Sequence, residues 1–579
     1  MASSLGRKAL GLAAVAAIAG AAVPATAAAK SDPRGNSLGI QVVKFAHGTS
    51  PAAMRQAVKD AGGEIVTDLS KLDRVTVVPK AAGFGKQIRA VSSVKGIWLD
   101  HVSKPQALFT PDPFHDADGP FWGEDAPGQW QWEDDRDGVE QAWNVTKGAG
   151  IKVAVIDTGI DPTHAELAAN TLFVDNTIPC NRLTAIFGGG IGGLHDCAQA
   201  DTEGHGTWVA SRIVGDDNGF ASNGIAPDAK VMGYKALATG FGGLTSWIVD
   251  AMVRACDNDA DVINMSLGGY NDLNDPDFPT ENADDYLFWK AGVDYCRKAG
   301  TAIVASAGNE HVRNLRRTVT VTGSGGSVSI AGAGVVSTQD NECVNALPGE
   351  ERERYANDFC GMLETPAGVP GVIMVSSTSN AIPAPTADVL PKYAPPASAV
   401  GTRDNLAYYS SYGERVDITA PGGGRKFGIP RFDAAPGTDV LYGGWGQLGA
   451  TTKNGELCRD TGDAGTFACF TVDGESFGWL QGTSMSSPQV AGVAALALAA
   501  NPTLQEKPDA LAAKLKGTAG KALVNHTGKT LKDGGAAWDG TACAAQYCHV
   551  SFATTGQNAI PFAQAYGAGM VNAAAAVAP

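Results

Sequence analysis

The chain has 579 residues, of which 44% are hydrophobic and 18% are charged, and its formal net charge at pH 7 is -16. This composition is typical of a glycine-rich globular protein with a large core and excludes a disordered chain. Nucleic-acid binding depends on clustered Lys and Arg side chains, which this acidic chain lacks, so we expect no nucleic-acid partner.

The first thirty residues have the layout of a secretory signal peptide. Arg7 and Lys8 precede an apolar run from Ala9 to Val23, and further small residues follow it. A membrane anchor is the alternative, but the run is shorter than the roughly 20 apolar residues that a spanning helix needs. We therefore predict a signal peptide over residues 1–29, secretion to the extracellular space and no membrane anchor.

Ten cysteines fit an exported protein, because disulfides persist outside the cytosol. We expect them to pair in chain order, which would mostly staple short loops, although the sequence does not fix the connectivity. A zinc site is the competing interpretation, and the lack of any Cys-x-x-Cys pair argues against it. The ten are Cys180, Cys197, Cys256, Cys296, Cys343, Cys360, Cys458, Cys469, Cys543 and Cys548.

Residues 38–99 alternate between strand-like and helix-like patterns in the order β-α-β-β-α-β, which predicts a small ferredoxin-like unit. The segments are LGIQVVKF, PAAMRQAVKDAGG, EIVTDLSKLDRVTVVPK for two strands, FGKQIRAVSSVK and GIWLD. An acidic, aromatic stretch follows over residues 111–135, and its prolines and glycines predict a linker or an extended arm.

From Ile151 onward, short apolar runs bounded by glycine alternate with helical patterns. The runs are IKVAVID, AKVMGYKAL, ADVINMSLGG, GTAIVASAGN and GVIMVSSTS. Runs rich in Val and Ile indicate a parallel sheet that helices cover on both faces. Ligands of such sheets bind outside the carboxyl ends of the strands, so we expect Asp157, Ser266 and Asn309 to converge on one edge.

Two long glycine-rich interruptions fall near residues 310–370 and 422–480, and each holds one cysteine pair. We expect both to be surface insertions. The segment RTVTVTGSGGSVSIAGAGVV within the first insertion predicts a β-hairpin.

Three side chains have the chemistry of a catalytic triad. Asp157 closes a strand in AVIDTGID, His205 opens a helical pattern between two glycines in EGHGTWVAS, and Ser484 opens the helix SMSSPQVAGVAALALAA. Singly, each has a structural interpretation as a turn residue, a helix-start histidine or an N-cap. Together they supply the nucleophile, the base and the group that orients the base, in one of the known chain orders.

The motifs AVIDTGID, GHGTWVA, INMSLGG, ASAGN and GTSMSSPQVAG resemble, in this order, the signatures of subtilisin-like serine peptidases. The match runs from about Trp130 to the closing GAGMVNAAAAV. The resemblance implies an α/β fold with three α/β/α layers around a mainly parallel sheet. The leading ferredoxin-like unit is similar to the family's propeptide, an intramolecular chaperone and inhibitor. We therefore expect a propeptide over residues 30–110, a peptidase domain over 111–579, and cleavage between about Asp100 and Gly128.

The resemblance also assigns roles. Asp157 would orient the imidazole, His205 would act as general base and then as general acid, and Ser484 would be the nucleophile. Asn309 would donate its side-chain amide to the oxyanion, with the Ser484 backbone N–H as a second donor. Ser266, Leu267 and Gly268 resemble the edge on which the substrate backbone lies as an added strand, with Gly268 keeping the primary pocket open.

The sequence departs from the common family pattern at four positions. Trp208 stands where His is usual, Ser211 where Gly is usual, and Ser486 and Gln489 where Ala and His are commoner. None of these changes removes a catalytic group. We expect Trp208 and Gln489 to alter the packing beneath the site.

Two rival motifs are present. Gly188, Gly190 and Gly193 satisfy G-x-G-x-x-G, but no strand precedes them and no helix follows, so a dinucleotide site is not expected. His164 could compete with His205 as the base, yet DPTHAEL predicts a turn entering a helix, which favours a structural role.

The sequence thus predicts a secreted serine endopeptidase that acts on polypeptides and is inhibited by its own propeptide. Catalysis would require no cofactor, and no metal ligand is assigned. Structural calcium is a possibility implied by the family that no EF-hand pattern locates. Two alternatives are a catalytically silent, protease-shaped binding protein and an acid-acting relative with Glu in place of His, which His205 disfavours.

Overall fold

The structure is a computed structural model. It describes residues 36, 38–105, 108–109, 137–187, 197–310, 312–337, 359–378, 406–407, 409–423, 447–453, 455–458, 469–521, 523 and 560–579. The expected signal peptide, the 111–135 arm and the G-x-G-x-x-G glycines lie outside these residues.

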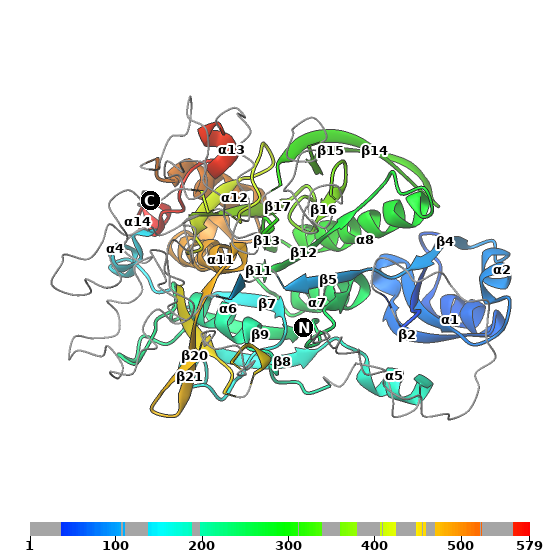
Figure 1. The fold of residues 1–579 in the computed structure, drawn as a ribbon, viewed down its shortest axis with the longest axis horizontal. Coiled ribbons are helices and arrows are strands. Elements are labelled where there is room, and N and C mark those ends of the chain that lie inside the picture. The colour runs from blue at the N-terminus through cyan, green and yellow to red at the C-terminus, as the bar shows by residue number, and fades with distance from the viewer. Residues whose placement is uncertain are drawn as a thin grey trace, which may run out of the picture.

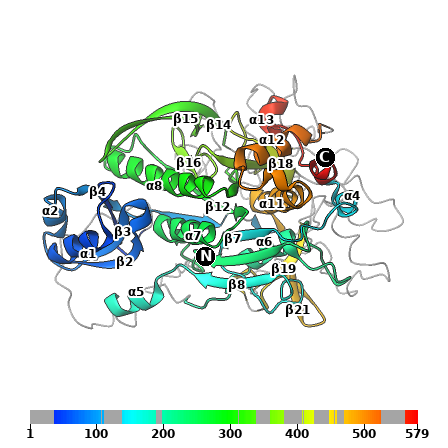
Figure 2. The ribbon, with the colours of Figure 1, turned by 180° about the vertical axis from the view of Figure 1, so that it is seen from behind.

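The N-terminal unit has the predicted β-α-β-β-α-β order and stands at one end of the molecule (Figures 1 and 2). Its antiparallel sheet has the strand order β2-β3-β1-β4, which confirms the ferredoxin-like prediction. The Ser50 hydroxyl caps the first helix by accepting a hydrogen bond from the Ala53 N–H. The elements are β1 (Gln41–Phe45), α1 (Pro51–Asp60), β2 (Gly63–Leu69), β3 (Arg74–Pro79), α2 (Phe84–Arg89) and β4 (Val94–Leu99).

A seven-stranded parallel sheet forms the centre of the second unit, in the order β18-β17-β13-β11-β7-β9-β8. All five predicted strands contribute to it, and the two edge strands β8 and β18 were not predicted. Strand β8 is partly exposed and β18 is short, so neither has a clear apolar pattern. The strands are β7 (Lys152–Asp157), β8 (Thr171–Asn176), β9 (Lys230–Lys235), β11 (Val262–Met265), β13 (Ala302–Ser306), β17 (Val372–Thr378) and β18 (Ile418–Pro421).

Helices cover both faces of this sheet, because both faces of its strands are apolar. Val153 and Val155 of β7 belong to the core beneath α6 and α11, whereas Ala154 and Ile156 belong to the core beneath α7 and α8. This arrangement confirms the three-layer α/β/α prediction. The covering helices are α6 (His205–Val214), α11 (Thr483–Ala500), α12 (Pro508–Thr518) and α14 (Ala573–Val577) on one side, and α7 (Thr245–Asp257) and α8 (Pro279–Lys298) on the other.

A second sheet joins the two units, in the order β10-β5-β12-β16-β15-β14. Strand β5 leaves the N-terminal unit directly after β4 and lies antiparallel between β10 and β12 of the second unit (Figure 1). The sequence pattern did not predict this pairing. The strands are β5 (Val102–Pro105), β10 (Gly243–Leu244), β12 (Leu267–Asn271), β14 (Asn314–Gly323), β15 (Gly326–Val336) and β16 (Leu363–Thr365).

The predicted hairpin of the first insertion is confirmed as β14 and β15, with Gly323 paired to Gly326 across the turn. Its tip reaches the N-terminal unit: a Cβ atom on Gly96 of β4 would lie 2.7 Å from the Ser324 Cβ. The Ser324 hydroxyl and N–H both donate to Asp284 of α8. The insertion therefore packs between the two units, while Val321 is fully buried in the core beneath it.

The second insertion contributes a further small sheet to which β6 of the N-terminal segment adds, next to β21. Its strands are β6 (Leu108–Phe109), β19 (Gln447–Thr451), β20 (Cys469–Val472) and β21 (Glu475–Gln481). The remaining elements are α4 (Val139–Trp143), α5 (Cys180–Phe187), α13 (Phe562–Tyr566) and the 3₁₀ turns η1 (Ser70–Leu72), η3 (Glu456–Cys458) and η4 (Pro502–Leu504).

Disulfide pairing in chain order is confirmed where the structure tests it. The bridges are Cys180–Cys197, Cys256–Cys296 and Cys458–Cys469. Cys360 is also disulfide-bonded, whereas Cys343, Cys543 and Cys548 lie outside the described residues. In the part of the chain that the structure describes, no helix is both long and apolar enough to cross a membrane.

Candidate active site

Asp157 and His205 form a buried pair at the carboxyl edge of the parallel sheet. Asp157 ends β7 and His205 begins α6, and the His205 Nδ1 lies 2.7 Å from the Asp157 Oδ1. Both side chains are fully buried. Gly206 makes the approach possible, since a Cβ there would lie 2.1 Å from the Gly159 carbonyl oxygen. The helix that carries the imidazole is thereby held against the strand that carries the carboxylate.

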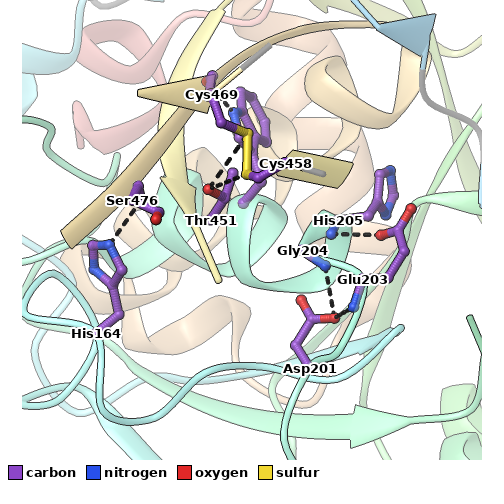
Figure 3. Close-up of a disulfide and its surroundings, with 11 residues drawn as sticks. His164, Asp201, Glu203, Gly204, His205, Thr451, Cys458, Cys469 and Ser476 are labelled. Carbon is purple, nitrogen blue, oxygen red and sulfur yellow. Dashed lines mark hydrogen bonds between the residues drawn. A yellow bond between two sulfur atoms is a disulfide. The ribbon is translucent and has the colours of Figure 1, made fainter. Parts of the chain in front are cut away.

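The Asp201 carboxylate organises the loop before His205 (Figure 3). The Asp201 Oδ1 accepts hydrogen bonds from the N–H groups of Glu203 and Gly204, at 3.0 and 2.9 Å. Its Oδ2 accepts from the backbone and the hydroxyl of Thr207, at 2.9 and 2.7 Å. Asp201 thus satisfies donors that the start of helix α6 leaves unpaired.

Glu203 is a partly buried acid close to His205, and its Oε2 accepts a hydrogen bond from the His205 backbone N–H at 2.7 Å. Burial raises the pKa of Glu203 to about 7, although the nearby His205 lowers it. Burial by itself lowers the pKa of His205, but the charge of Asp157, its hydrogen bond and the charges of Glu203 and Asp201 outweigh that effect and raise the pKa to about 9. The protonated imidazole is therefore favoured electrostatically.

Helix α11 brings Ser484 to the same edge. Gly482, with φ +147°, turns the chain out of β21, and Ser484 is the second residue of the helix and fully buried. Its hydroxyl donates to the Ser266 carbonyl oxygen at 3.1 Å. Among the described residues, His205 Nε2 has no hydrogen-bond partner. In this state the hydroxyl is therefore engaged with the end of β11 and not with the imidazole.

Asn309 follows β13 and is fixed by the residue before the serine. Its Oδ1 accepts from the Thr483 N–H and hydroxyl, both at 2.9 Å. With the amide oxygen fixed in this way, the Nδ2 group faces away from Thr483. The sequence-predicted residues Asp157, His205, Ser484, Asn309 and Ser266 thus meet at one edge of the sheet.

The edge of β12 that contains Leu267 and Gly268 is paired with β5. Leu267 pairs with Pro105 and Gly268 with Lys104, in antiparallel register. On the far side of the site, Gln481 of β21 pairs with Leu108. The N-terminal segment therefore lies along the edge on both sides of Ser484.

Three of the four departures from the family pattern have hydrogen-bond partners in the second insertion or directly before it. The Trp208 indole N–H donates to the Gly478 carbonyl at 3.0 Å, and the Ser211 hydroxyl accepts from the Ala450 N–H at 2.9 Å. The Gln489 amide donates to the Pro421 carbonyl and to the Gln447 Oε1, at 2.5 and 2.9 Å. The Ser486 hydroxyl is buried and has no partner among the described residues.

His164 has the structural role that its motif predicted. Its Nε2 lies 3.0 Å from the Ser476 carbonyl oxygen (Figure 3). Its ring packs edge-on against Phe477. Burial lowers the pKa of His164, against the raising effects of its hydrogen bond and of Glu475. The Cys458–Cys469 bridge lies nearby. Leu457, directly before this bridge, donates its N–H to the Glu203 carbonyl. The second insertion therefore braces the loop before His205.

Within the described ranges, no group of three or more His, Cys, Asp or Glu side chains is arranged to hold a metal ion.

Sequence reasoning missed Asp201 and Glu203, although both lie within four residues of His205. The composition of DTEGHGT, with two acids just before a helix start, was the available signal. What the motif could not show is that Glu203 is partly buried against the imidazole-bearing residue.

A parallel sheet with helices on both faces, and an Asp–His pair at the same carboxyl edge as a serine at a helix start, is the arrangement of a subtilisin-like serine peptidase. The subtilase family model matches residues 148–567, well over half of the chain, and the chain belongs to that family. With its relatives named as serine proteinases, the chain is a serine-type endopeptidase.

The relatives have low sequence identity to this chain, but the matches extend over large parts of it. The Thermophilic serine proteinase of Bacillus sp. (strain AK1) is 24% identical over 468 residues, which cover 79% of this chain and 77% of that protein. Subtilisin NAT of Bacillus subtilis subsp. natto is 26% identical over 356 residues, 62% of this chain, and the chain spans only 57% of its length. The crystal structure of the epidermin leader peptide processing serine protease of Staphylococcus aureus shares the fold, with a TM-score of 0.55 at 19% identity over 93% of this chain and 97% of that chain.

Replacing Glu203 with Gln should move the acidic limb of the pH profile to lower pH. The predicted role of His205 as general base needs the neutral imidazole, so activity should be lost as pH falls through the raised pKa of His205, to which Glu203 contributes. The amide still accepts from the His205 N–H. The measurement is kcat/KM of the mature enzyme against pH. Glu456→Gln, an exposed change of the same charge, should leave the limb in place, and an unmoved limb in Glu203→Gln would contradict the electrostatic role.

Replacing Gln489 with Leu should destabilise the protein by about 1–3 kcal/mol, because it leaves buried acceptors unpaired. The measurement is the urea unfolding midpoint in a Ser484→Ala background, which avoids self-digestion. Exposed Gln505→Leu is the matched control and should change stability by less than about 0.5 kcal/mol. Equal effects of the two changes would show that the Gln489 contacts contribute no stability.

Proposed function

We propose that the chain is the precursor of a secreted endopeptidase that cleaves polypeptides through an acyl-enzyme on Ser484. The observation that carries this proposal is the buried 2.7 Å pair of His205 and Asp157 at the edge to which α11 brings the serine. Family membership supports the serine-protease class, and the individual roles rest on this geometry.

The first half of the reaction would form the acyl-enzyme. The Ser484 hydroxyl turns from the Ser266 carbonyl to His205, as catalytic hydrogen bonds often tighten only with substrate bound. Its Oγ attacks the carbonyl carbon while His205 Nε2 takes the hydroxyl proton. The Asn309 amide and the Ser484 N–H stabilise the oxyanion. The carbon–nitrogen bond then breaks and the proton passes from His205 to the leaving amine.

Hydrolysis of the acyl-enzyme reverses these transfers with water as the nucleophile. His205 takes a proton from water, the hydroxide oxygen bonds to the acyl carbon, and the ester bond to Ser484 breaks. The imidazole then returns the proton to the Ser484 oxygen. The Asp157 carboxylate stabilises the imidazolium that forms in each half.

The N-terminal unit would act as a built-in inhibitor, because β5 occupies the substrate edge. Its pairings with Leu267 and Gly268 are the main-chain contacts that a substrate strand would make. A second contact also holds the N-terminal unit in place, because the tip of the β14–β15 hairpin packs against Gly96. Inhibition would therefore persist after cleavage until the unit dissociates or is digested.

The register of the flanking strands suggests the bond that is cut. Pro105 pairs with Leu267 before the site and Leu108 pairs with Gln481, three residues ahead of Ser484. The middle peptide bond between these two anchors joins Gln106 to Ala107. We therefore place the start of the mature enzyme at Ala107, slightly before the boundary at 110 that composition indicated. Secretion, with removal of residues 1–29, would precede this step.

Ser484→Ala should leave the precursor uncleaved, because no nucleophile remains. The wild type should yield a mature chain that begins at Ala107, as determined by N-terminal sequencing. Ser486→Ala is the matched control: it removes an unpartnered hydroxyl two residues away and should process normally. Processing of Ser484→Ala at the same bond would overturn the assignment of the nucleophile.

A further inference from the structure

An acidic group that the proposed mechanism does not use lies beside the substrate edge. Glu310 directly follows the oxyanion donor Asn309, and its Oε2 accepts a hydrogen bond from the Tyr270 hydroxyl at 2.9 Å. Tyr270 lies on β12, two residues beyond Gly268. Strand β16 lies on the edge of β12 that is opposite to β5. Its Glu364 pairs directly with Tyr270, so the two side chains lie on the same face of the sheet.

Glu364 is fully buried, and neither carboxylate oxygen has a hydrogen-bond partner among the described residues. The neighbouring cation, Arg415, is used elsewhere: its Nη1 donates to Asp417 at 2.6 Å. Its other N–H groups donate to the backbone carbonyls of Gly368, Val369 and Val372. A buried carboxyl group without a partner is costly, and in a native protein it calls for an explanation such as a missing ligand.

The two carboxyl groups influence each other, and burial raises the pKa of both. Burial raises the pKa of Glu364 well above its usual range; Arg415 opposes this and Glu310 adds to it. Burial also raises the pKa of Glu310, against the hydrogen bond from Tyr270. The titratable groups that face Glu364 are Glu310, Tyr270 of β12, Tyr286 of α8 and Arg415.

The acids stand where a substrate side chain would arrive. A substrate strand on β12 passes Gly268 and Gly269, neither of which has a side chain to block the space toward β16. The Glu310 carboxylate lies under the loop that holds the oxyanion donor, since a Cβ on Gly308 would be 2.7 Å from its Oε2 and 3.1 Å from the Tyr270 hydroxyl. The residue whose carbonyl reaches Asn309 therefore has its side chain nearest to these two acids.

We propose that Glu310 and Glu364 form the floor of the primary specificity pocket, and that the enzyme prefers Lys or Arg immediately before the scissile bond. A Lys or Arg side chain supplies both the charge and the N–H donors that the unpartnered Glu364 lacks. This inference rests on the proposed peptidase mechanism and adds its substrate class.

Self-processing after Gln106 is compatible with such a pocket. A Gln side chain also presents N–H donors to carboxyl oxygens, although without a charge. The covalently attached segment needs little affinity, because an intramolecular reaction gains a high effective concentration. In separate substrates, which lack that advantage, the charged side chain should be favoured.

The test compares two peptide substrates that differ only in Lys or Leu before the scissile bond, hydrolysed by the mature enzyme. The wild type should have the higher kcat/KM for the Lys peptide. In Glu364→Gln this value should fall by about 10- to 100-fold, the range expected for losing a hydrogen bond to a charged group. The value for the Leu peptide should change by no more than about two-fold, within the scatter of a neutral contact.

Glu414→Gln is the matched control, since it removes an equal charge from an exposed side chain paired with Arg317. It should leave the ratio of the two peptides unchanged. Because binding a cation requires the pocket acids to release protons, the Lys-to-Leu ratio of the wild type should also rise as the pH increases through the raised pKa values of these two acids. This pH measurement needs no variant and applies even if Glu364→Gln fails to fold.

The pocket assignment would be overturned if the wild type had the higher kcat/KM for the Leu peptide. It would also be overturned if Glu364→Gln lowered kcat/KM equally for both peptides. Hydrolysis of the Leu peptide would still be seen in that case. Failure of the peptidase mechanism itself has a different signature, namely no hydrolysis of either peptide and normal processing of Ser484→Ala. The two failures are therefore distinguishable.

Discussion

The buried hydrogen bond between His205 and Asp157 is the contact on which the site depends. It joins the end of a central strand to the start of a helix, and both side chains are shielded from water. An ionised pair in such a place needs further polar support. The Asp201 loop and the Glu203 carboxylate supply it, and the glycine at 206 lets the backbones approach closely enough for the bond to form.

The second constraint is the edge of β12 that β5 covers, which under the proposed function would accept the chain to be cut. An edge strand with free backbone groups pairs readily with another strand. Strand β5 covers this edge, so under the proposed function the contacts that would bind substrate would keep the precursor inactive. The two insertions strengthen this arrangement, one by reaching the N-terminal unit at Ser324 and the other by pairing through β21 with β6.

Much of the fold was predictable because its signals are local. The apolar runs, the β-α-β-β-α-β order and the Gly-rich hairpin turn each depend on residues close together in the sequence. Strand β5 was not predictable, because its partners at 243 and 267 lie far along the chain and Val102–Pro105 has no distinctive pattern. The exposed edge strand β8 was missed for the opposite reason, since it lacks the apolar run that marked its neighbours.

The site divides in the same way. The motifs indicated Asp157, His205, Ser484 and Asn309, because each sits at a strand end or a helix start that the pattern marks. The pattern says nothing of burial, so the environment of Glu203 and Glu364 emerged only from the structure. The contacts of Gln489 were not predictable either, because its partners Pro421 and Gln447 lie far apart in the sequence.

The most direct test of the account is covalent labelling of the mature enzyme with a fluorophosphonate, followed by mass spectrometry of its peptides. Only a serine activated by a neighbouring base reacts readily with such a reagent. The account predicts a single adduct, on Ser484, whose formation is abolished in His205→Ala. No adduct, or an adduct on another serine, would contradict it and would favour a protease-shaped binding protein.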